Sequence, residues 1–432
     1  MVGKRRRTLN YKGKKLLILS GIAMNRKIVS GAREMGIYTV VTDTRDCDHS
    51  PAKKLADEHW EISYADIDGL ARKCRETGID AVLACSGETT QIPYYQICRE
   101  LGLPCYLTEK ELDLLTDKNA FKRMCREAGV GVIPDYSEDD CLRGKAEFPV
   151  FVKPARASGS RGQTICCSAE EAASAIAEAR KESGTGEAVI EKYLGERNSF
   201  QVTLFFVNGE PFVTRTADGY KGTRADRLDK VALCSISPSR YTEAYFEKAH
   251  PALTEMLKQC GVQNGPVMVQ GFCDDGVFRF YDPGRRFPDT DYELVFTQQF
   301  GVNPIQMMIE FAFTGSMPTG KLNNRQAYLN GSTCAILFPT LRGGAIHEIR
   351  GMNEVERMPE VRSIIPLCSN GDMIPWTFTT KQRLAHITML CGGLKEARDA
   401  VRRVQKLLDV TDDEGKSMIY CPFDADRLIE SD

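Results

Sequence analysis

The stretch PVFVKPARASGSRG, residues 149–162, decides how this chain is interpreted. Its apolar run, residues 150–152, predicts a short strand, and Lys153 follows directly after it. The loop beyond is built from small residues, so backbone N–H groups can close around an anion such as a phosphate chain. The loop residues concerned are Ser158, Gly159, Ser160 and Gly162, with Arg161 as a further positive charge. A glycine-rich turn with solvated basic side chains is the alternative interpretation.

The composition is that of an ordinary globular chain. Its 432 residues are enough for two to four packed units, and 42% are hydrophobic and 27% charged. The net charge of −2 gives no basis for a nucleic-acid or membrane surface, and no run approaches the roughly 20 apolar residues that span a bilayer. The sixteen cysteines are scattered without zinc spacing, which is typical of free thiols in a reducing cytosol. We therefore expect a cytoplasmic protein whose first residues, 1–14, are disordered.

Short apolar runs alternate with helical periodicity from residue 15 to about 107. The expected strands are 15–20, 38–44 and 80–85, and the expected helices are 26–36, 70–78 and 94–102. This alternation predicts a parallel sheet covered by helices, with ligands beyond the carboxyl ends of the strands. That edge would carry Ser20, Gly21, Asp43 and residues 86–88. A dinucleotide site is the rival interpretation, but the turn after the first strand has one glycine where G-x-G-x-x-G is needed.

Residues 115–134 predict a helix that begins near Lys118 and ends at Gly129. Phe121, Met124 and Cys125 would share its apolar face, and Lys122 lies one turn after Lys118. Helix lysines are usually solvated, so the alternative is that Lys118 and Lys122 are surface residues without a binding role. Another helix is expected over residues 169–183, followed by strands around an Asn208-Gly209 turn.

A second hairpin is expected over residues 265–287, turning at Asp275-Gly276. It would bring Gln270 close to Asp282, beside a loop that carries Arg285 and Arg286. One carboxylate and one amide oxygen next to a phosphate site suit Mg²⁺, which takes few protein ligands. A polar pair across a hairpin also occurs without any metal, and that alternative stays open.

These motifs, in this order, resemble the ATP-grasp superfamily over about residues 15–320. They are the Asp-Lys at a helix start (117–118), the V-K-P lysine with its glycine-rich loop, the E-K-x-L hinge (191–194) and the two metal-binding strands. The resemblance implies an α/β and α+β protein with a Rossmann-like parallel-sheet domain at the N-terminus, two lobes that clamp ATP and a C-terminal α+β part. The expected bounds are 1–117, 118–320 (a small lid lobe of about 135–195 and a larger lobe of about 196–320) and 321–432.

The resemblance also implies a role for each matching position. Lys118 and Lys153 would hold the phosphates of ATP, and the loop with Ser158, Gly159, Ser160 and Gly162 would close over them as a lid. Glu191, with the backbone of Lys192 and Leu194, would bind the adenine. Gln270 and Asp282 would hold Mg²⁺. Arg286 would stabilise the transferred phosphate, so that Lys153 and Arg286 are the expected catalytic residues.

The chain departs from the superfamily pattern at three places. Where the metal motif is usually E-x-N-x-R, it has Asp282, Gly284 and Arg286, which puts a second metal ion in doubt. Asp289 and Asp291 are candidate substitutes. The usual ribose-binding acid falls near Ser199, with Glu196 as a candidate replacement. Arg286 is followed by FPDT and the chain has no Met-Lys-Met, which argues against carboxylation of biotin.

The last part of the chain, residues 321–432, is expected to complete the acceptor side of the cleft. Residues 334–351 predict two strands joined by a Gly343-Gly344 turn, and residues 394–408 predict an amphipathic helix. His347 and His386 are expected to be structural.

The function implied by the resemblance is an ATP-dependent ligase that joins a carboxylate to an amine through an acyl phosphate. ATP, a small carboxylate and an amine are the expected partners, and a homodimer is an open alternative for the assembly. The basic loop at residues 220–230 would suit an anionic substrate. Two alternatives are phosphoryl transfer of the carbamoyl phosphate synthetase kind and a non-catalytic ATP-binding module, which Gly284 keeps open.

Overall fold

The structure is a computed structural model that describes residues 10–156, 162–195, 198–224, 227–377 and 379–429. Contacts divide the chain into two compact units. The first unit comprises the chain up to Tyr106 together with Asn303–Pro318, and the second comprises Leu107–Val302 and Thr319–Asp432. These units do not follow the three parts expected from the sequence, and that three-part division stays a prediction. The expected lid residues Ser158, Gly159 and Ser160, and Glu196, lie outside the described residues.

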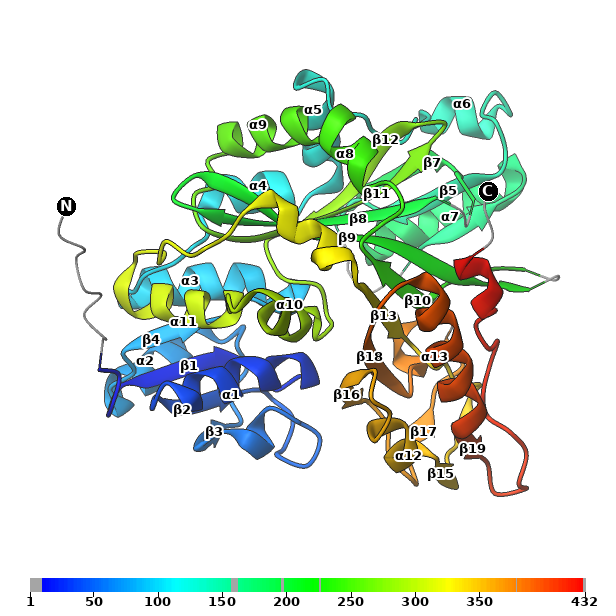
Figure 1. Cartoon of the computed structure of the whole chain (residues 1–432). Helices are drawn as coiled ribbons and strands as arrows, with labels where there is room; N and C mark the ends of the chain where they lie inside the picture. The colour runs from blue at the N-terminus through cyan, green and yellow to red at the C-terminus, as the bar shows by residue number, and fades with distance from the viewer. Residues whose placement is uncertain (1–9, 157–161, 196–197, 225–226, 378, 430–432) are drawn as a thin grey trace. The chain divides into compact units, whose positions relative to one another are not determined.

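The first unit is a parallel sheet with helices, as the alternating pattern predicts. Its strand order is β3-β2-β1-β4, and all three pairings are parallel (Figure 1). The elements are β1 (Lys15–Leu19), α1 (Arg26–Glu34), β2 (Tyr38–Thr42), β3 (Glu58–Trp60), α2 (Ile67–Thr77), β4 (Ala81–Leu83), α3 (Gln91–Leu101) and α11 (Pro304–Thr314). The expected parallel sheet is confirmed, and helix α11 joins it from a distant part of the chain, packing on α1 and β4.

The start of this unit corrects one expectation. Residues 1–9 are outside the described residues, but residues 10–14 have defined positions. Tyr11 is buried, and its ring centroid lies 5.2 Å from that of Phe313 on α11. A large aromatic side chain with a packing partner gains enough from burial to fix the backbone around it.

An eight-stranded antiparallel sheet forms the centre of the second unit. Its strand order is β12-β11-β8-β9-β10-β13-β18-β16. The strands are β8 (Ser199–Val207), β9 (Glu210–Arg224), β10 (Arg227–Ser237), β11 (Gly265–Asp274), β12 (Val277–Gly284), β13 (Thr333–Leu337), β16 (Val361–Pro366) and β18 (Ala385–Cys391). The two expected turns are confirmed at the ends of hairpins β8–β9 and β11–β12, where Asn208-Gly209 and Asp275-Gly276 all have positive φ.

One face of this sheet is apolar and packs against helices. Phe200, Val202 and Val267 belong to a core with α5 (Lys118–Glu127), α8 (Thr242–Lys248) and α9 (His250–Cys260). Ala385 and Ile387 belong to a second core with α13 (Leu394–Leu407), which confirms the predicted amphipathic helix (Figure 1). Because side chains alternate along a strand, the residues between these point to the other face.

That other face carries a row of polar residues across the strands. Asp282 faces Gln270, which faces Gln201, and further along Ser235 faces Ile336, which faces Thr388, which faces Ser363. We call this side of the sheet the polar face. Its polar residues are Gln201, Thr203, Arg215, Ser235, Ser237, Gln270, Asp282, Ser363, His386 and Thr388.

A three-stranded sheet and several helices complete the second unit. The sheet has the order β6-β5-β7, with β5 (Val150–Pro154), β6 (Thr164–Cys166) and β7 (Ala188–Lys192), and α7 (Ala169–Glu182) packs on it. The smaller elements are α4 (Glu109–Leu115), α6 (Glu138–Leu142), α10 (Tyr292–Phe300), β14 (Gly344–Ala345), β15 (Glu348–Arg350), α12 (Met352–Glu356), β17 (Met373–Ile374) and β19 (Asp409–Thr411). In the part of the chain that the structure describes, no helix has the length and apolar character to cross a membrane.

Two expectations for this unit are wrong. Strand β13 does not turn at Gly343-Gly344 into a hairpin, because it pairs with β10 on one side and β18 on the other. All five residues of β13 are buried, and such an apolar strand is most stable inside a sheet rather than at its edge. The described part of the basic stretch, residues 220–224 and 227–230, is also not a loop, because these residues belong to β9 and β10, which pair as far as Arg224 and Arg227.

Candidate functional site

Lys118 is the first residue of helix α5, as the sequence predicts. Asp117 caps the helix, and its side chain accepts a hydrogen bond from the Ala120 N–H at 2.9 Å. This cap fixes the direction in which the Lys118 side chain leaves the helix. The side chain is buried, and its Nζ lies 3.2 Å from Asp282 Oδ1 on β12.

Lys153 lies within strand β5, one residue before its end, and its side chain contacts Glu191 on the neighbouring strand β7. Its Nζ lies 2.8 Å from Glu191 Oε2, and Lys122 Nζ lies 2.9 Å from the other carboxylate oxygen. All three side chains are at most 2% exposed. Burial lowers the pKa of the Lys153 ammonium below its ordinary value, an effect that Glu191 opposes. Glu191 therefore holds two buried lysines in place. The sequence alone did not distinguish a solvated Lys122 from a buried one, and the structure shows it buried beside Glu191.

Within the described residues, the E-K-x-L hinge lacks one bond of the backbone ladder for a reason that is visible in the sequence. Asp135 and Glu191 pair antiparallel, so Lys192 faces Pro134, and the Lys192 N–H donates to the Pro134 carbonyl at 2.8 Å. A backbone N–H from the facing residue would normally return this bond, but proline has none. The Lys192 carbonyl is thereby left with acceptor capacity next to Leu194, where an amino group of a purine could donate.

The end of the glycine-rich loop is described at Gly162. This residue has φ +61°, and a Cβ there would lie 2.9 Å from Pro154 Cγ and 3.0 Å from Glu182 Cβ. Both the positive φ and the close contacts require glycine. The loop therefore returns to β6 directly beside the strand that carries Lys153.

Gln270 and Asp282 face each other across the β11–β12 hairpin, as predicted. A bulge follows this pair, and the extra residue is Tyr281, whose hydroxyl donates to Gln270 Oε1 at 3.1 Å. The Tyr281 ring lies 4.9 Å from Lys153 Nζ, so the tyrosine touches both the lysine and the amide. The sequence pattern missed Tyr281, because a bulge changes which residues share a face.

Gln270 and Asp282 belong to no larger acidic cluster among the described residues. The described residues hold no group of three or more His, Cys, Asp or Glu side chains that could enclose a metal ion. Asp289 lies 3.4 Å from Arg286 Nη1, and Asp291 accepts a hydrogen bond from Ser363, so both candidate substitutes have other contacts. A Cβ at Gly284 would meet only ordinary contacts, 3.6 Å or more from Arg286 and Met268. The backbone at residue 284 would therefore accept a side chain.

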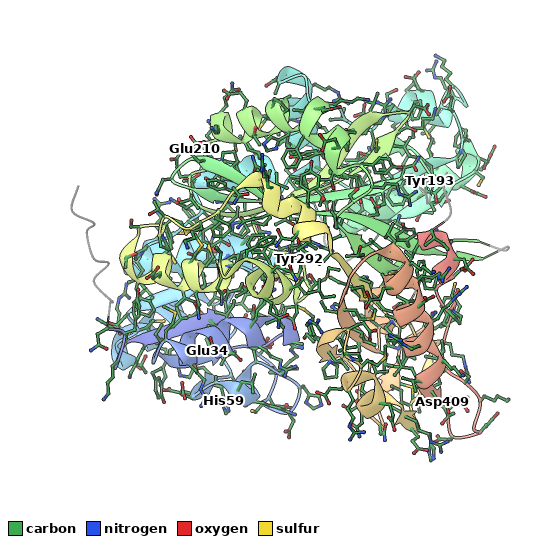
Figure 2. All side chains as sticks on the ribbon, in the orientation of Figure 1. Glu34, His59, Tyr193, Glu210, Tyr292 and Asp409 are labelled. Carbon is green, nitrogen blue, oxygen red and sulfur yellow. The ribbon has the colours of Figure 1, made fainter. Side chains whose placement is uncertain are left out.

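Arg215 is a polar-face residue that sequence reasoning missed. Its guanidinium donates to Ser237 Oγ (3.0 Å), Gln201 Oε1 (2.8 Å) and Ser235 Oγ (2.9 Å), and it lies 5.1 Å from the ring of Tyr292. Figure 2 labels Tyr292 on α10. Arg215 is 2% exposed, and burial lowers its pKa. Its hydrogen-bond partners come from β8 and β10, the two strands that flank its own strand β9, so only the sheet register reveals the group.

The expected rim of the first unit has a compact structure of its own. Asp43 at the end of β2 accepts a hydrogen bond from the Gly21 N–H at 2.8 Å and forms an ion pair with Arg45 at 2.9 Å. These contacts occupy the carboxylate that the rival dinucleotide interpretation would use on a ribose. Ser86 is buried and Gly87 has φ +83°.

Comparisons with known proteins agree with this architecture. Residues 117–205 match the family of the carbamoyl-phosphate synthase L chain, ATP binding domain. The 2-oxoglutarate carboxylase small subunit of Hydrogenobacter thermophilus is 26% identical over 200 residues, which are 42% of this chain and 42% of that protein. This chain thus matches less than half the length of that relative.

Solved structures match almost the whole chain. The biotin carboxylase domain of the Hydrogenobacter thermophilus 2-oxoglutarate carboxylase, in complex with MgADP, ADP and bicarbonate, has a TM-score of 0.73 at 18% identity and covers 97% of this chain and 99% of that one. An L-amino acid ligase from Bacillus licheniformis has a TM-score of 0.71 at 17% identity and covers 92% and 98%. The expected fold is confirmed by these matches. The chain has the ATP-grasp fold.

Proposed function

We propose that this protein is an ADP-forming ligase that uses MgATP to activate a carboxylate and joins it to an amine. The observation that carries the proposal is a continuous set of contacts between residues far apart in the sequence. Lys153 contacts Tyr281, Tyr281 donates to Gln270, Gln270 faces Asp282, and Asp282 pairs with Lys118. This set combines two ammonium groups, an amide oxygen and a carboxylate, which is the chemistry that a metal-bound polyphosphate needs.

The proposed assignments follow from the chemistry of each group. Lys118 and Lys153 would neutralise the phosphates, the Lys192 carbonyl and Leu194 N–H would bind the adenine edge, and the residues from 158 to 162 would cover the triphosphate. Gln270 and Asp282 would hold Mg²⁺, whose charge favours the reaction by offsetting the negative charge of the γ-phosphate. The pair fits one ion, because Gly284 supplies no ligand.

The proposed ligation proceeds in two steps. A carboxylate oxygen attacks the γ-phosphorus, the bond to the β-phosphate oxygen breaks, and ADP leaves. An amine nitrogen then attacks the acyl carbon, inorganic phosphate leaves with the C–O bond electrons, and the amine loses a proton. Lys153 and Arg286 would stabilise charge on the transferred phosphoryl group, and exclusion of water would protect the acyl phosphate from hydrolysis.

A second candidate is phosphoryl transfer to a carboxylate or carbamate without ligation to an amine. The match of residues 117–205 to a carbamoyl-phosphate synthase domain favours it, and the same residues would act. The L-amino acid ligase among the structural matches favours ligation. The two differ in their products, because only ligation forms an amide.

A phosphate-release screen tests the proposal. Carboxylates are crossed with amines in the presence of MgATP, and mass spectrometry checks for the amide. We expect at least one pair to stimulate turnover, and Lys153→Ala to reduce it by about 100-fold or more, because a buried charge on the phosphates is lost. Lys181→Ala is the matched control, since that side chain is 75% exposed on α7.

The outcomes separate the candidates. Phosphate release without an amide would favour phosphoryl transfer. MgATP binding without turnover under any pair would favour a non-catalytic module. Equal turnover in Lys153→Ala and the unmodified protein would refute the assignment of the site.

A further inference from the structure

Lys122 is a buried lysine that the proposed reaction does not use. It lies one turn after Lys118 on α5, and its side chain is 1% exposed. Its Nζ lies 2.9 Å from Glu191 Oε1 on β7 and 3.4 Å from Asp135 Oδ2. An ammonium group is buried only where carboxylates pair with it, so these two acids explain how Lys122 is tolerated. They do not explain what the chain gains from a third lysine at this place.

The backbone places the two acids directly opposite each other. Asp135 and Glu191 form an antiparallel bridge, and the next residue, Tyr136, donates its N–H to the Ile190 carbonyl at 3.0 Å. Like charges that face each other across a strand pair are destabilising. Lys122 contacts both carboxylates and offsets their repulsion. A purely structural role for Lys122 would end there.

Lys122 also belongs to a row of alternating charges that ends at Lys153. Glu191 is shared, because its Oε2 atom lies 2.8 Å from Lys153 Nζ and its other oxygen contacts Lys122. Asp135 is shared in the same way between Lys122 and Arg126. The row holds three cations and two anions, so its net charge is +1. Lys153 is the buried end at 2% exposure, and Arg126 is the other end at 46% exposure.

The removal of Lys122 would change what Lys153 can offer to a ligand. Glu191 would then have one cation instead of two, and both of its oxygens could turn to Lys153. A phosphate would have to compete with that carboxylate for the whole of the ammonium charge. Burial lowers the pKa of Lys153 and Glu191 opposes this effect, so the lysine needs the carboxylate to stay charged. By sharing Glu191, Lys122 keeps the carboxylate in place without letting it neutralise Lys153 completely.

We propose that Lys122 is a positioning residue, which holds one oxygen of Glu191 so that the other fixes Lys153 without cancelling its charge. This rests on the proposed function in that Lys153 is taken to contact the phosphates of ATP. Lys122 itself contacts no nucleotide in this proposal, because its ammonium group is already held by two carboxylates. Its effect on a ligand is therefore transmitted through Lys153 and concerns the phosphates only.

The test is a double-variant cycle on the full chain, with Lys122→Met, Lys153→Ala and both changes together. Calorimetry measures the affinity for MgADP, and NMR titration measures the affinity for adenosine, which has no phosphate. We expect Lys122→Met to weaken MgADP binding about three- to tenfold, because the charge available to the phosphates falls, and to change adenosine binding by less than about twofold. In the Lys153→Ala protein, Lys122→Met should have no further effect on MgADP, because the residue through which it acts is gone.

Two further variants control the cycle. Arg123→Met removes the same charge from an exposed side chain next to Lys122 on α5, and it should leave both affinities unchanged. Lys122→Arg keeps a positive charge beside Glu191, so it should bind MgADP more tightly than Lys122→Met does. Should Lys122→Met fail to fold, Lys122→Gln takes its place in the cycle, because it removes the charge and keeps a hydrogen-bond donor.

Three results would overturn the proposal. Unchanged MgADP affinity in Lys122→Met would show that Lys153 does not depend on it. Equal weakening of adenosine and MgADP would make the role of Lys122 structural, and additive losses in the double variant would show that it acts independently of Lys153.

The proposed function fails in a different way. A screen in which no carboxylate and amine give an amide would count against ligation and leave the role of Lys122 standing, because the cycle depends on nucleotide binding alone. Unchanged MgADP affinity in Lys153→Ala would refute the phosphate role of Lys153 and, with it, the role of Lys122.

Discussion

Positive charge is balanced differently at the two ends of the polar face. At one end, which we call the lysine cluster, Lys118, Lys122 and Lys153 each lie within 3.2 Å of a carboxylate oxygen of Asp282 or Glu191. At the other end, Arg215 contacts neutral oxygens and Arg383 keeps an unpartnered Nε within the described residues.

The difference indicates two ways of stabilising a cation. A ligand at the lysine cluster must compete with carboxylates that already hold the cations, so binding there exchanges one set of ion pairs for another. Arg383 has no carboxylate within ion-pair distance among the described residues, and the charge of Asp289 raises its pKa against the lowering effect of burial. The lysines are thus stabilised by carboxylates, whereas the half-buried Arg383 is stabilised by an aromatic ring, a backbone carbonyl and a neutral histidine.

Glu191→Gln is the change with the largest expected effect, because it removes the buried carboxylate that two lysines share and leaves Lys122 only its 3.4 Å contact with Asp135. It leaves Lys122 and Lys153 buried without their shared carboxylate, and we expect a loss of about 3–5 kcal/mol in the free energy of unfolding by urea. The control is Glu147→Gln, which breaks the Lys192–Glu147 pair at 2.6 Å, whose side chains are 42% and 72% exposed. That change should cost about 1 kcal/mol or less. Similar losses in the two variants would show that burial does not distinguish the pairs.

His386 gives the arginine end a pH dependence. Its pKa is about 3 in the folded protein, against about 6.5 for an unfolded histidine, so the folded state binds fewer protons between these values. Stability is therefore complete above about pH 6.5 and falls as the pH drops toward 3. Between pH 6.5 and 5 the loss amounts to about 2 kcal/mol.

Urea unfolding at pH 7 and pH 5 checks this effect in His386→Asn, which should lose less stability on acidification than the unmodified protein. His250 on α9 is the reference, because burial lowers its pKa to about 4 and gives a slope of the same sign. The effects of His250→Asn and His386→Asn should add, since the two residues belong to different elements without shared contacts. An unchanged pH slope in His386→Asn would contradict the buried neutral state.

The two ends also differ in how far the sequence predicts them. Lys153 follows an apolar run, and Lys118 follows a capping aspartate. Gln270 and Asp282 lie on the two arms of a hairpin with an Asp-Gly turn, so each residue was found from its neighbours alone. Arg215, Arg383 and Thr388 have no local signature. Their neighbourhood arises from pairings such as Ile336 with Thr388, which join strands far apart in the sequence.

The same physics explains the errors. A local turn signal at Gly343-Gly344 suggested a hairpin, but burial of β13 on both faces favoured distant partners. The bulge at Tyr281 could not be predicted for a related reason, since strict alternation of side chains along β12 assigns Tyr281 to the wrong face of the sheet. Local patterns thus predict ends and turns of elements, whereas the sheet register decides which residues share a face.

Gly284→Asn tests whether the lysine cluster lies beside a metal ion, because it adds the amide that the E-x-N-x-R motif has at this position. A Cβ fits at residue 284 with contacts of 3.6 Å or more, so we expect a change in the free energy of unfolding within about 1 kcal/mol. The added ligand should lower the Mg²⁺ concentration for half-maximal phosphate release by about two- to tenfold. Gly284→Ala fills the same space without a ligand and should have no such effect. An equal response of the alanine variant would show that the amide reaches no metal.

Tyr281→Phe is expected to have the smallest effect, because it removes one hydroxyl and keeps the ring. The ring still lies over Lys153 and stacks on Phe272 at 5.5 Å, but Gln270 Oε1 loses its 3.1 Å hydrogen bond. We expect about 1 kcal/mol of lost stability and a few-fold higher Mg²⁺ requirement, since the amide oxygen is no longer held in one orientation. Tyr281→Leu removes the ring as well and should also weaken MgADP binding, which Tyr281→Phe should not. Equal weakening of MgADP binding in both variants would show that the hydroxyl of Tyr281, not its ring, positions Lys153. Tyr281 would then link Gln270 to Lys153 through the single hydrogen bond of that hydroxyl.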